Sequence, residues 1–253
     1  MNRKIALVTG AAKGIGEIIA KTLVEAGYDL GIHYHSNKER AVKLCNELTQ
    51  KGACVRIYQA DISKVDEIKR MFDQFYEDFG GIDLMVNNAG ISSEASFLDI
   101  TEEFFDKTCN LDWKGTFFCA QLAAKNMVEK KNKGVIINIA SNQAEGCWPN
   151  ATVYAGCKGA VVKFTKNSAM ELAKYGIRVV AIAPGYTEIF WNKDSHIYDA
   201  IDKLPLKRFA DRKEIADAVV YLASDAAGYI TGTCLTIDGG ATLPVVACNE
   251  FVK

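Results

Sequence analysis

The chain lacks the features that mark several large classes of protein. Its formal net charge is −1 over 253 residues and it has neither a basic nor an acidic tail, so no general attraction to nucleic acid or to an anionic membrane is expected. It has no internal repeat and no low-complexity linker. Its longest uncharged stretches, 146–157 and 226–237, are well below the ~18 residues that suggest a membrane span. We therefore expect neither nucleic acid nor membrane as a partner.

Signals for metal binding and for export are missing too. The eight cysteines include no C-x-x-C pair, which argues against a zinc site and against a dithiol redox site. His33 and His35 alternate along one expected strand without further ligands nearby, so no metal is expected. The apolar stretch at 5–9 is too short for a signal peptide. Because 49% of the chain is apolar, it can build a core without disulfides, and a reducing, cytoplasmic location is expected.

Short β-rich runs alternate with longer helical patterns along the whole chain. The expected strands are 5–9, 30–35, 55–59, 84–87, 135–139, 179–183 and 234–237, and the expected helices are 15–26, 38–50, 64–79, 101–131, 152–175 and 212–223. This alternation predicts a parallel sheet with helices on both faces, doubly wound by right-handed crossovers. The fold class is therefore α/β: one Rossmann-type domain over residues 1–253, with a sheet of seven strands.

Two local patterns refine this expectation. Ser63 with Asp66, and Asp211 with Glu214, resemble capping boxes at the starts of two helices. The segment 186–211 breaks the alternation beyond the sixth strand, where ligands bind in open α/β sheets. Its mixed aromatic and charged composition predicts a substrate loop that orders over the site as a lid.

A glycine-rich loop follows the first expected strand. It reads Thr9-Gly10-Ala11-Ala12-Lys13-Gly14-Ile15-Gly16 and leads into the first helix. Glycines let the backbone approach a pyrophosphate, and the N-terminus of a helix offers free N–H donors to it. A glycine triplet can also be a simple turn, but its place within a strand–helix unit favours nucleotide binding.

Other strand ends carry residues suited to the same cofactor. Asp61 could accept from an adenine amino group, or it could cap the helix that follows. Asn87-Asn88-Ala89-Gly90 could connect neighbouring strands and leave backbone free for the cofactor, or it could be an ordinary turn. Pro184-Gly185 forms a rigid wall for a flat ring, and Thr187 could contact a carboxamide, although this stretch is equally an ordinary loop start.

The sequence also contains groups that could move a proton. Tyr154 and Lys158 are four residues apart in a helical pattern, so they face the same way, and Ser141 ends a neighbouring apolar run. The pair Tyr34 and Lys38 shares that spacing but has no other catalytic mark nearby. Asn110 is unusual within a long helical pattern, and a local kink there could hold a water.

Taken in order from Lys4 to Gly240, these motifs resemble the short-chain dehydrogenase/reductase family in its single-domain form of roughly 250 residues, including members that reduce 3-oxoacyl thioesters or oxidise glucose. The resemblance implies Tyr154 as acid/base and Ser141 as the group that orients the carbonyl. It implies Lys158 as the group that favours ionised Tyr154 and binds the ribose, and Asn110 as support for a relay water. Gly156 departs from the pattern, since many members have Ser there.

Two sets of binding residues follow from the resemblance and the strand ends. The expected cofactor residues are Gly10, Ala12, Lys13, Gly14, Ile15, Gly16, His35, Ser36, Asp61, Ile62, Asn88, Ala89, Gly90, Tyr154, Lys158, Pro184, Gly185 and Thr187. The expected substrate pocket contains Ser92, Gln143, Trp148, Tyr186 and Trp191. The two tryptophans could equally belong to the core.

The expected cofactor is NADP(H), with NAD(H) possible. The second strand ends without an acid before Glu39, so the carboxylate that would bond the ribose of NAD is missing. Lys13, Lys38 and Arg40 are candidate partners for a 2′-phosphate, although they could simply be solvated. In the family, a basic residue at the position of Lys13 accompanies NADP preference.

Two classes of function remain open. The first is an NAD(P)(H)-dependent oxidoreductase acting on a carbonyl or a secondary alcohol, best taken as an NADPH-dependent ketone or 3-oxoacyl thioester reductase. A sugar, polyol or hydroxysteroid dehydrogenase is the alternative within that class. The second class is a cofactor-binding sensor or scaffold without turnover, against which the intact set of catalytic residues argues. The resemblance also implies a homo-oligomer, a tetramer paired through 101–131 and 152–175.

Overall fold

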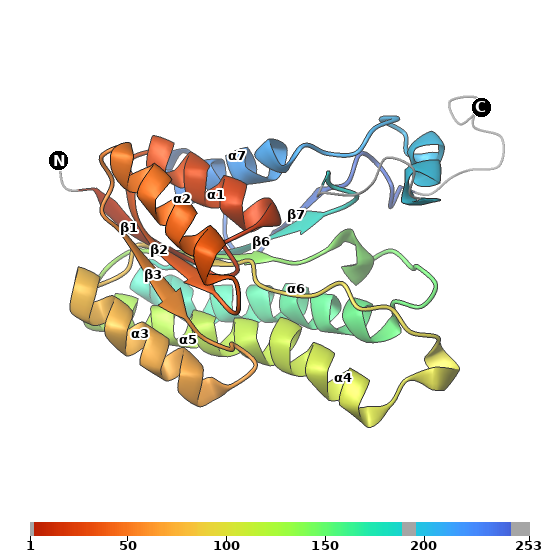
Figure 1. The fold of residues 1–253 in the computed structure, drawn as a ribbon, viewed down its shortest axis with the longest axis horizontal. Helices are drawn as coiled ribbons and strands as arrows, with labels where there is room; N and C mark the ends of the chain where they lie inside the picture. The colour runs from red at the N-terminus through yellow and green to blue at the C-terminus, as the bar shows by residue number, and fades with distance from the viewer. Residues whose placement is uncertain (1–2, 189–195, 244–253) are drawn as a thin grey trace.

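The computed structural model describes residues 3–188 and 196–243 of the chain, and it has the expected architecture (Figure 1). Its seven parallel strands are β1 (Lys4–Val8), β2 (Tyr28–Tyr34), β3 (Val55–Gln59), β4 (Leu84–Asn87), β5 (Val135–Ile139), β6 (Arg178–Pro184) and β7 (Cys234–Ile237). Their order in the sheet is β3-β2-β1-β4-β5-β6-β7. The doubly wound parallel sheet predicted from the sequence is confirmed.

Helices cover both faces of the sheet (Figure 1). They are α1 (Gly14–Glu25), α2 (Lys38–Gln50), α3 (Val65–Phe79), α4 (Glu102–Cys109), α5 (Thr116–Glu129), α6 (Thr152–Leu172) and α7 (Arg212–Ala223). The buried clusters place α1, α2 and α7 on one face and α3, α5 and α6 on the other. On β1, Ala6 and Val8 join the first cluster and Leu7 joins the second, because successive strand side chains point to opposite faces.

The strand order places a crevice at the centre of the sheet. The chain runs outward from β1 to β3 and then crosses back to β4 on the other side of β1. At such a switch point the loops after β1 and β4 diverge to opposite faces, and a ligand fits between them at the carboxyl edge. This geometry gathers the glycine loop, the Asn88 turn and the ends of β5 and β6 at one edge.

The expected helix over 101–131 is three elements instead of one. The helix α4 ends at Cys109, a π-helical stretch covers Asn110–Gly115, and α5 begins at Thr116. Such wide turns are rare and often occur at functional sites. The deviation expected at Asn110 is therefore present, and it extends over six residues.

One of the two expected capping boxes is wrong. Asp211 and Glu214 form the predicted box at the start of α7. Ser63 does not cap α3, whose first turn is preceded by Lys64 without a side-chain cap. Ser63 is a donor instead: its backbone N–H and its hydroxyl donate to the Asp61 carboxylate at 3.0 and 2.7 Å, in the turn before the helix.

Candidate active site

The glycine loop has the geometry of a phosphate cradle. Gly10 and Gly14 both have a φ of 63°, a region that side chains other than glycine rarely adopt. A Cβ on Gly16 would lie 2.5 Å from Asn88 Nδ2 and 2.6 Å from the Gly10 carbonyl oxygen, so only glycine fits there. Lys13 precedes α1 without capping it, which leaves the N–H groups of the first turn free of a side-chain acceptor. These are the properties that bind a pyrophosphate.

A buried histidine holds this loop in place. His33 Nδ1 accepts from the Gly10 backbone N–H at 3.0 Å, and Nε2 lies 3.0 Å from the Ala60 carbonyl oxygen. These partners fix the neutral tautomer with its proton on Nε2. Burial lowers the pKa of His33 to about 4. The sequence analysis considered this residue only as a metal ligand and missed its structural role.

The residues after β4 connect neighbouring strands, as the sequence analysis considered. The backbone N–H groups of Asn88 and Ala89 both donate to the Thr9 hydroxyl, at 2.9 and 3.0 Å. The Asn88 side-chain amide donates to the Thr9 carbonyl oxygen at 2.9 Å. The turn thereby fixes the opposite wall of the crevice against the glycine loop.

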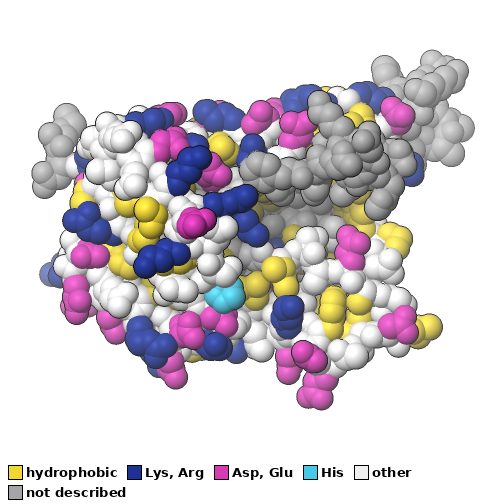
Figure 2. Space-filling model, viewed as in Figure 1, with side chains coloured by type: hydrophobic (Ala, Val, Ile, Leu, Met, Phe, Trp, Pro, Cys, Tyr) yellow, Lys and Arg dark blue, Asp and Glu magenta, His cyan; other side chains and the backbone are white. Residues whose placement is uncertain are grey.

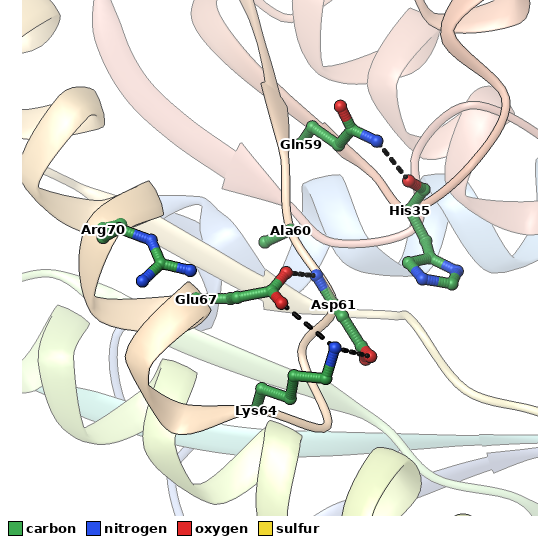
Figure 3. A pocket seen from close by; sticks show the side chains of 7 residues that line it. All are labelled: His35, Gln59, Ala60, Asp61, Lys64, Glu67 and Arg70. Carbon is green, nitrogen blue, oxygen red and sulfur yellow. Dashed lines mark hydrogen bonds and ion pairs between the residues drawn. The ribbon is translucent and has the colours of Figure 1, made fainter.

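A polar cavity of about 410 Å³ lies at the ends of β2 and β3 (Figure 3). It is lined by His35, Gln59, Ala60, Asp61, Lys64, Glu67 and Arg70. Figure 3 shows the Asp61 carboxylate turned toward Lys64, whose Nζ lies 3.3 Å from Asp61 and 3.2 Å from Glu67. Glu67 also accepts from the Asp61 backbone N–H at 2.7 Å. The N-cap position of α3 is Lys64 and the Asp61 carboxylate accepts from Ser63 before the helix, so the helix-capping interpretation of Asp61 is wrong. Its contact with adenine stays a prediction.

The other residues expected to bind the cofactor follow the ends of β1, β2 and β3, and they differ in burial. Ile62 is buried after β3, and its carbonyl oxygen closely approaches Gly115. His35 and Ser36 are exposed after β2, and Ala12 is buried in the glycine loop. Lys13 and Lys38 are exposed and form no ion pair with another described residue. On this face of the molecule, basic side chains border the hollow between the two helical layers (Figure 2).

The proton-transfer residues meet at the start of α6. Tyr154 and Lys158 lie one turn apart, with Lys158 Nζ 5.5 Å from the centre of the Tyr154 ring. Lys158 is buried, and its Nζ donates to the Ile139 carbonyl oxygen at 3.1 Å, which ties α6 to the end of β5. Ser141 follows the same strand, and its hydroxyl oxygen accepts from the Gln143 N–H at 3.2 Å. The turn containing Ser141 packs against α6, so the three groups lie at one edge of the sheet.

Asn110 and its neighbour Asp112 differ in their surroundings. Asn110 opens the π-helical stretch, is half-exposed, and its side chain forms no hydrogen bond with a described residue. Its support for a water stays a prediction. Asp112 is fully buried and lies close to Gly90 and Lys158, a position that the sequence analysis missed. The available signal was weak: Asp112 is the one acid between Cys109 and Cys119 in the sequence.

The end of β6 is a tightly packed turn, and its role as a wall for a flat ring stays a prediction. A Cβ on Gly185 would lie 2.6 Å from Asp238 Cβ, so this turn packs tightly against the end of β7. Thr187 is buried, and its hydroxyl donates to the Gly185 carbonyl oxygen at 3.1 Å. Asp238 in turn accepts from the backbone N–H groups of Gly240 and Thr242. The contact of Thr187 with a carboxamide stays a prediction.

Part of the expected substrate pocket is an aromatic wall. Trp148 Nε1 donates to the Tyr186 hydroxyl at 3.1 Å, and the Tyr186 ring stacks on Phe209 at 5.3 Å. Gln143 is half-buried, and its Oε1 is buried without a donor among the described residues. Ser92 is exposed after β4. Trp191 lies outside the described residues.

These residues fit a nicotinamide dinucleotide. The tight cradle around Gly16 has no room for a side chain, and the uncapped start of α1 faces the switch point of the sheet. Within the described residues, no group of three or more His, Cys, Asp or Glu side chains could hold a metal ion. None of the described helices combines the length and apolarity needed to span a membrane.

Comparisons with known proteins agree with this geometry. A family model described as enoyl-(acyl carrier protein) reductase matches residues 10–242. The 3-oxoacyl-(acyl-carrier-protein) reductase of Staphylococcus epidermidis is 37% identical over 242 residues, which cover 94% of this chain and 98% of that protein. A crystal structure of acetoin dehydrogenase from Enterobacter cloacae superposes with a TM-score of 0.91 at 33% identity, covering 98% of this chain and all of that one.

A short-chain dehydrogenase/reductase structure from Serratia marcescens gives a TM-score of 0.90 at 32% identity, covering 94% of this chain and 98% of that one. Fold and site together define a Rossmann-type oxidoreductase that uses a nicotinamide cofactor. The chain belongs to the short-chain dehydrogenase/reductase family.

Proposed function

We propose that this protein is an NADPH-dependent reductase of a ketone or a 3-oxoacyl thioester, with Tyr154 as the proton donor. The observation that carries the proposal is the placement of Tyr154 one turn before Lys158, with the Lys158 ammonium near the tyrosine ring. An ammonium stabilises the phenolate that remains after proton donation. A tyrosine without such a neighbour would be a poor acid/base near neutral pH.

Each residue of the site has a separate role in this proposal. The bound cofactor supplies the hydride. Ser141 accepts from the Gln143 N–H, so its own hydroxyl proton is available to donate to the carbonyl oxygen as negative charge develops there. Tyr154 then gives its proton to that oxygen. Lys158 is held by the Ile139 carbonyl, which keeps its charge beside the tyrosine throughout.

The preference for NADP(H) rests on charge at the adenosine end. Lys13 and Lys38 are exposed without an ion-pair partner among the described residues, and no carboxylate follows β2 before Glu39. A partly exposed phosphate–lysine pair contributes on the order of 1–2 kcal/mol, which corresponds to a ten- to thirty-fold difference in affinity. Titration of NADPH and NADH by fluorescence should show this ratio at low salt and a smaller one at high salt.

Lys13 itself can be tested against a matched cation. Lys13→Ala should reduce the NADPH-to-NADH affinity ratio toward one, whereas Lys133→Ala, on the connection before β5, should leave it unchanged. Equal affinities in the unmodified protein, or tighter binding of NADH, would overturn the preference. So would a Lys13→Ala protein with an unaltered ratio.

The substrate has two candidate classes. The resemblance to a 3-oxoacyl-(acyl-carrier-protein) reductase supports an acyl thioester. The structural resemblance to an acetoin dehydrogenase supports a small ketone, and the aromatic wall of Trp148, Tyr186 and Phe209 is suited to one. A screen with a 3-oxoacyl thioester, acetoin and a polyol, each with both cofactors, separates them. Absence of turnover with a wide panel, together with intact cofactor binding, would favour the sensor or scaffold class instead.

A further inference from the structure

Asp112 is a charged residue that the proposed reaction does not yet use. Its side chain is fully buried within the π-helical stretch between α4 and α5. Oδ1 accepts from the Ile91 backbone N–H at 2.9 Å, whereas Oδ2 is buried without a hydrogen-bond partner among the described residues. A buried carboxyl with one unpaired oxygen is costly to fold, so it calls for an explanation.

The Asp112 carboxyl lies directly against Gly90. A Cβ built on Gly90 would lie 2.4 Å from Asp112 Oδ1 and 3.3 Å from Lys158 Nζ. The carboxyl and the ammonium therefore both lie where a side chain of residue 90 would begin, and only glycine allows both to approach it. Their separation exceeds that of an ion pair, since no contact within 4.0 Å joins them.

The buried ammonium of Lys158 has few other partners. It donates to the Ile139 carbonyl oxygen and lies beside the Tyr154 ring. The titratable groups packed nearby on α4 and α6 are the thiols of Cys109 and Cys157, whose sulfurs are 3.5 Å apart. Burial raises the pKa of Cys157 to about 12, so this thiol stays neutral near pH 7. Asp112 is thus the nearby group able to carry a compensating negative charge.

We propose that Asp112 is a positioning residue of the active site: its carboxylate acts across Gly90 as the counter-charge of Lys158 and so sets how strongly Lys158 favours the ionised form of Tyr154. Burial raises the pKa of Asp112, while the Lys158 ammonium and the Ile91 N–H oppose that shift by favouring the carboxylate. The negative charge offsets part of the ammonium's field at the phenol. This inference rests on the proposed function for the role of Tyr154.

The test is the pH profile of hydride transfer. Asp112→Asn keeps the shape and the acceptor for Ile91 but removes the charge, so the ammonium acts on Tyr154 without opposition. The midpoint of the kcat/KM profile should move to lower pH by about one unit, the scale of one charge a few ångströms away at a dielectric constant near 20. Asp106→Asn removes a carboxylate from the exposed face of α4 and should leave the midpoint in place.

A second readout does not depend on turnover. Ultraviolet titration of tyrosine ionisation, corrected with Tyr154→Phe in each background, reports Tyr154 directly and should show the same shift. If Asp112→Asn does not fold, Asp112→Ser can still accept from Ile91, and the same shift is expected. A shifted titration without turnover on any substrate would refute the proposed reaction but keep the counter-charge role. Unshifted midpoints in both measurements, or a shift to higher pH, would overturn the counter-charge role of Asp112.

Discussion

At the scale of single residues, Tyr154 carries the most direct prediction. Tyr154→Phe keeps the ring beside Lys158 and removes the hydroxyl, so cofactor binding and the melting temperature should change little. The rate constant kcat should fall at least ~10²-fold, the usual contribution of a positioned acid/base. Stopped-flow measurement of NADPH oxidation provides the test.

The second Tyr-x-x-x-Lys in the chain provides the control. Tyr34 ends β2 and Lys38 begins α2, so this pair does not share a helix face as Tyr154 and Lys158 do. Tyr34→Phe should therefore keep kcat within a few-fold of the unmodified protein. A Tyr154→Phe protein that retains more than a tenth of the rate would exclude Tyr154 as the proton donor.

The burial of His33 predicts that the folded protein loses free energy of unfolding in acid. Its pKa in the folded protein is about 4, below the ~6.5 of an unfolded chain, so the unfolded state binds the proton more readily. The stabilisation is complete above pH 6.5 and declines as the pH falls toward 4. The total loss attributable to His33 is at most about 3 kcal/mol.

Urea unfolding at several pH values measures this contribution. The difference in unfolding free energy between the unmodified protein and His33→Asn should shrink between pH 7 and pH 4.5, because the carboxylates contribute equally to both proteins. A constant difference for His33→Asn would contradict the assignment.

At the scale of elements, the junction of the glycine loop with α1 tolerates no side chain. In Gly16→Ala the new methyl group would meet Asn88 Nδ2 and the Gly10 carbonyl oxygen at 2.5–2.6 Å, so the loop must shift. We expect cofactor affinity to fall at least ten-fold and the melting temperature to drop. Fluorescence titration and calorimetry measure the two effects.

Gly156→Ala is the matched change on α6. No atom outside the helix backbone lies within 4 Å of a Cβ at Gly156, which is exposed between Tyr154 and Lys158 in the sequence. Alanine in a helix interior is favoured over glycine by roughly 0.5–1 kcal/mol, so this variant should be more stable, with unchanged cofactor affinity. Equal effects of the two substitutions would show that the tight packing at Gly16 does not matter.

Elements were easier to predict than the contacts between them. Strands β3, β4, β5 and β7 have the predicted bounds, because runs of β-branched and apolar residues between turns define buried parallel strands. Asn110 suggested a local kink, but its extension over six residues could not be predicted, since the helical pattern continues through them. The start of α3 was also beyond the sequence: Ser63 fits a capping pattern, yet it donates to Asp61 and α3 begins at Val65 without a side-chain cap.

The same limit applies to the site. Tyr154, Lys158 and Ser141 were predictable because their spacing and the strand ends bring them to one edge. Asp112 and His33 were not, since their importance depends on burial and on partners far away in the sequence. A π-helical turn changes which side of a helix a residue faces, so helical spacing alone misplaces the residues within it.

At the scale of the whole molecule, the face of α5 and α6 predicts self-association. A cavity of about 520 Å³ lies between these helices, lined by aromatic side chains that include Trp113, Phe117 and Phe164. The three rings form a cluster with centres 5.2–5.7 Å apart and are only partly buried. Apolar surface of this kind on a helix pair is typically covered by another protein surface.

We expect a second copy of this chain to cover that surface, within a tetramer. Sedimentation at micromolar concentration should give a species several times the 27.7 kDa chain mass. Phe117→Glu should produce smaller species, while Tyr229→Glu, an exposed aromatic away from these helices, should not affect this contact. A monomer at all micromolar concentrations would refute the prediction.

The way in which the loop after β6 is anchored affects how this protein can evolve. Its two ends are joined where it leaves the body: the Glu188 N–H donates to the Ala210 carbonyl at 2.8 Å, and the Ala210 N–H donates to Tyr186 at 2.9 Å. The two ends of the loop are therefore held next to each other by the backbone, whatever the length of the segment between them. Because the entropy of closing a loop grows only slowly with its length, longer, shorter or foreign inserts cost the scaffold little. The substrate role predicted for this segment then implies that an exchange of the insert would change substrate choice while the sheet and the proton-transfer residues remain as they are.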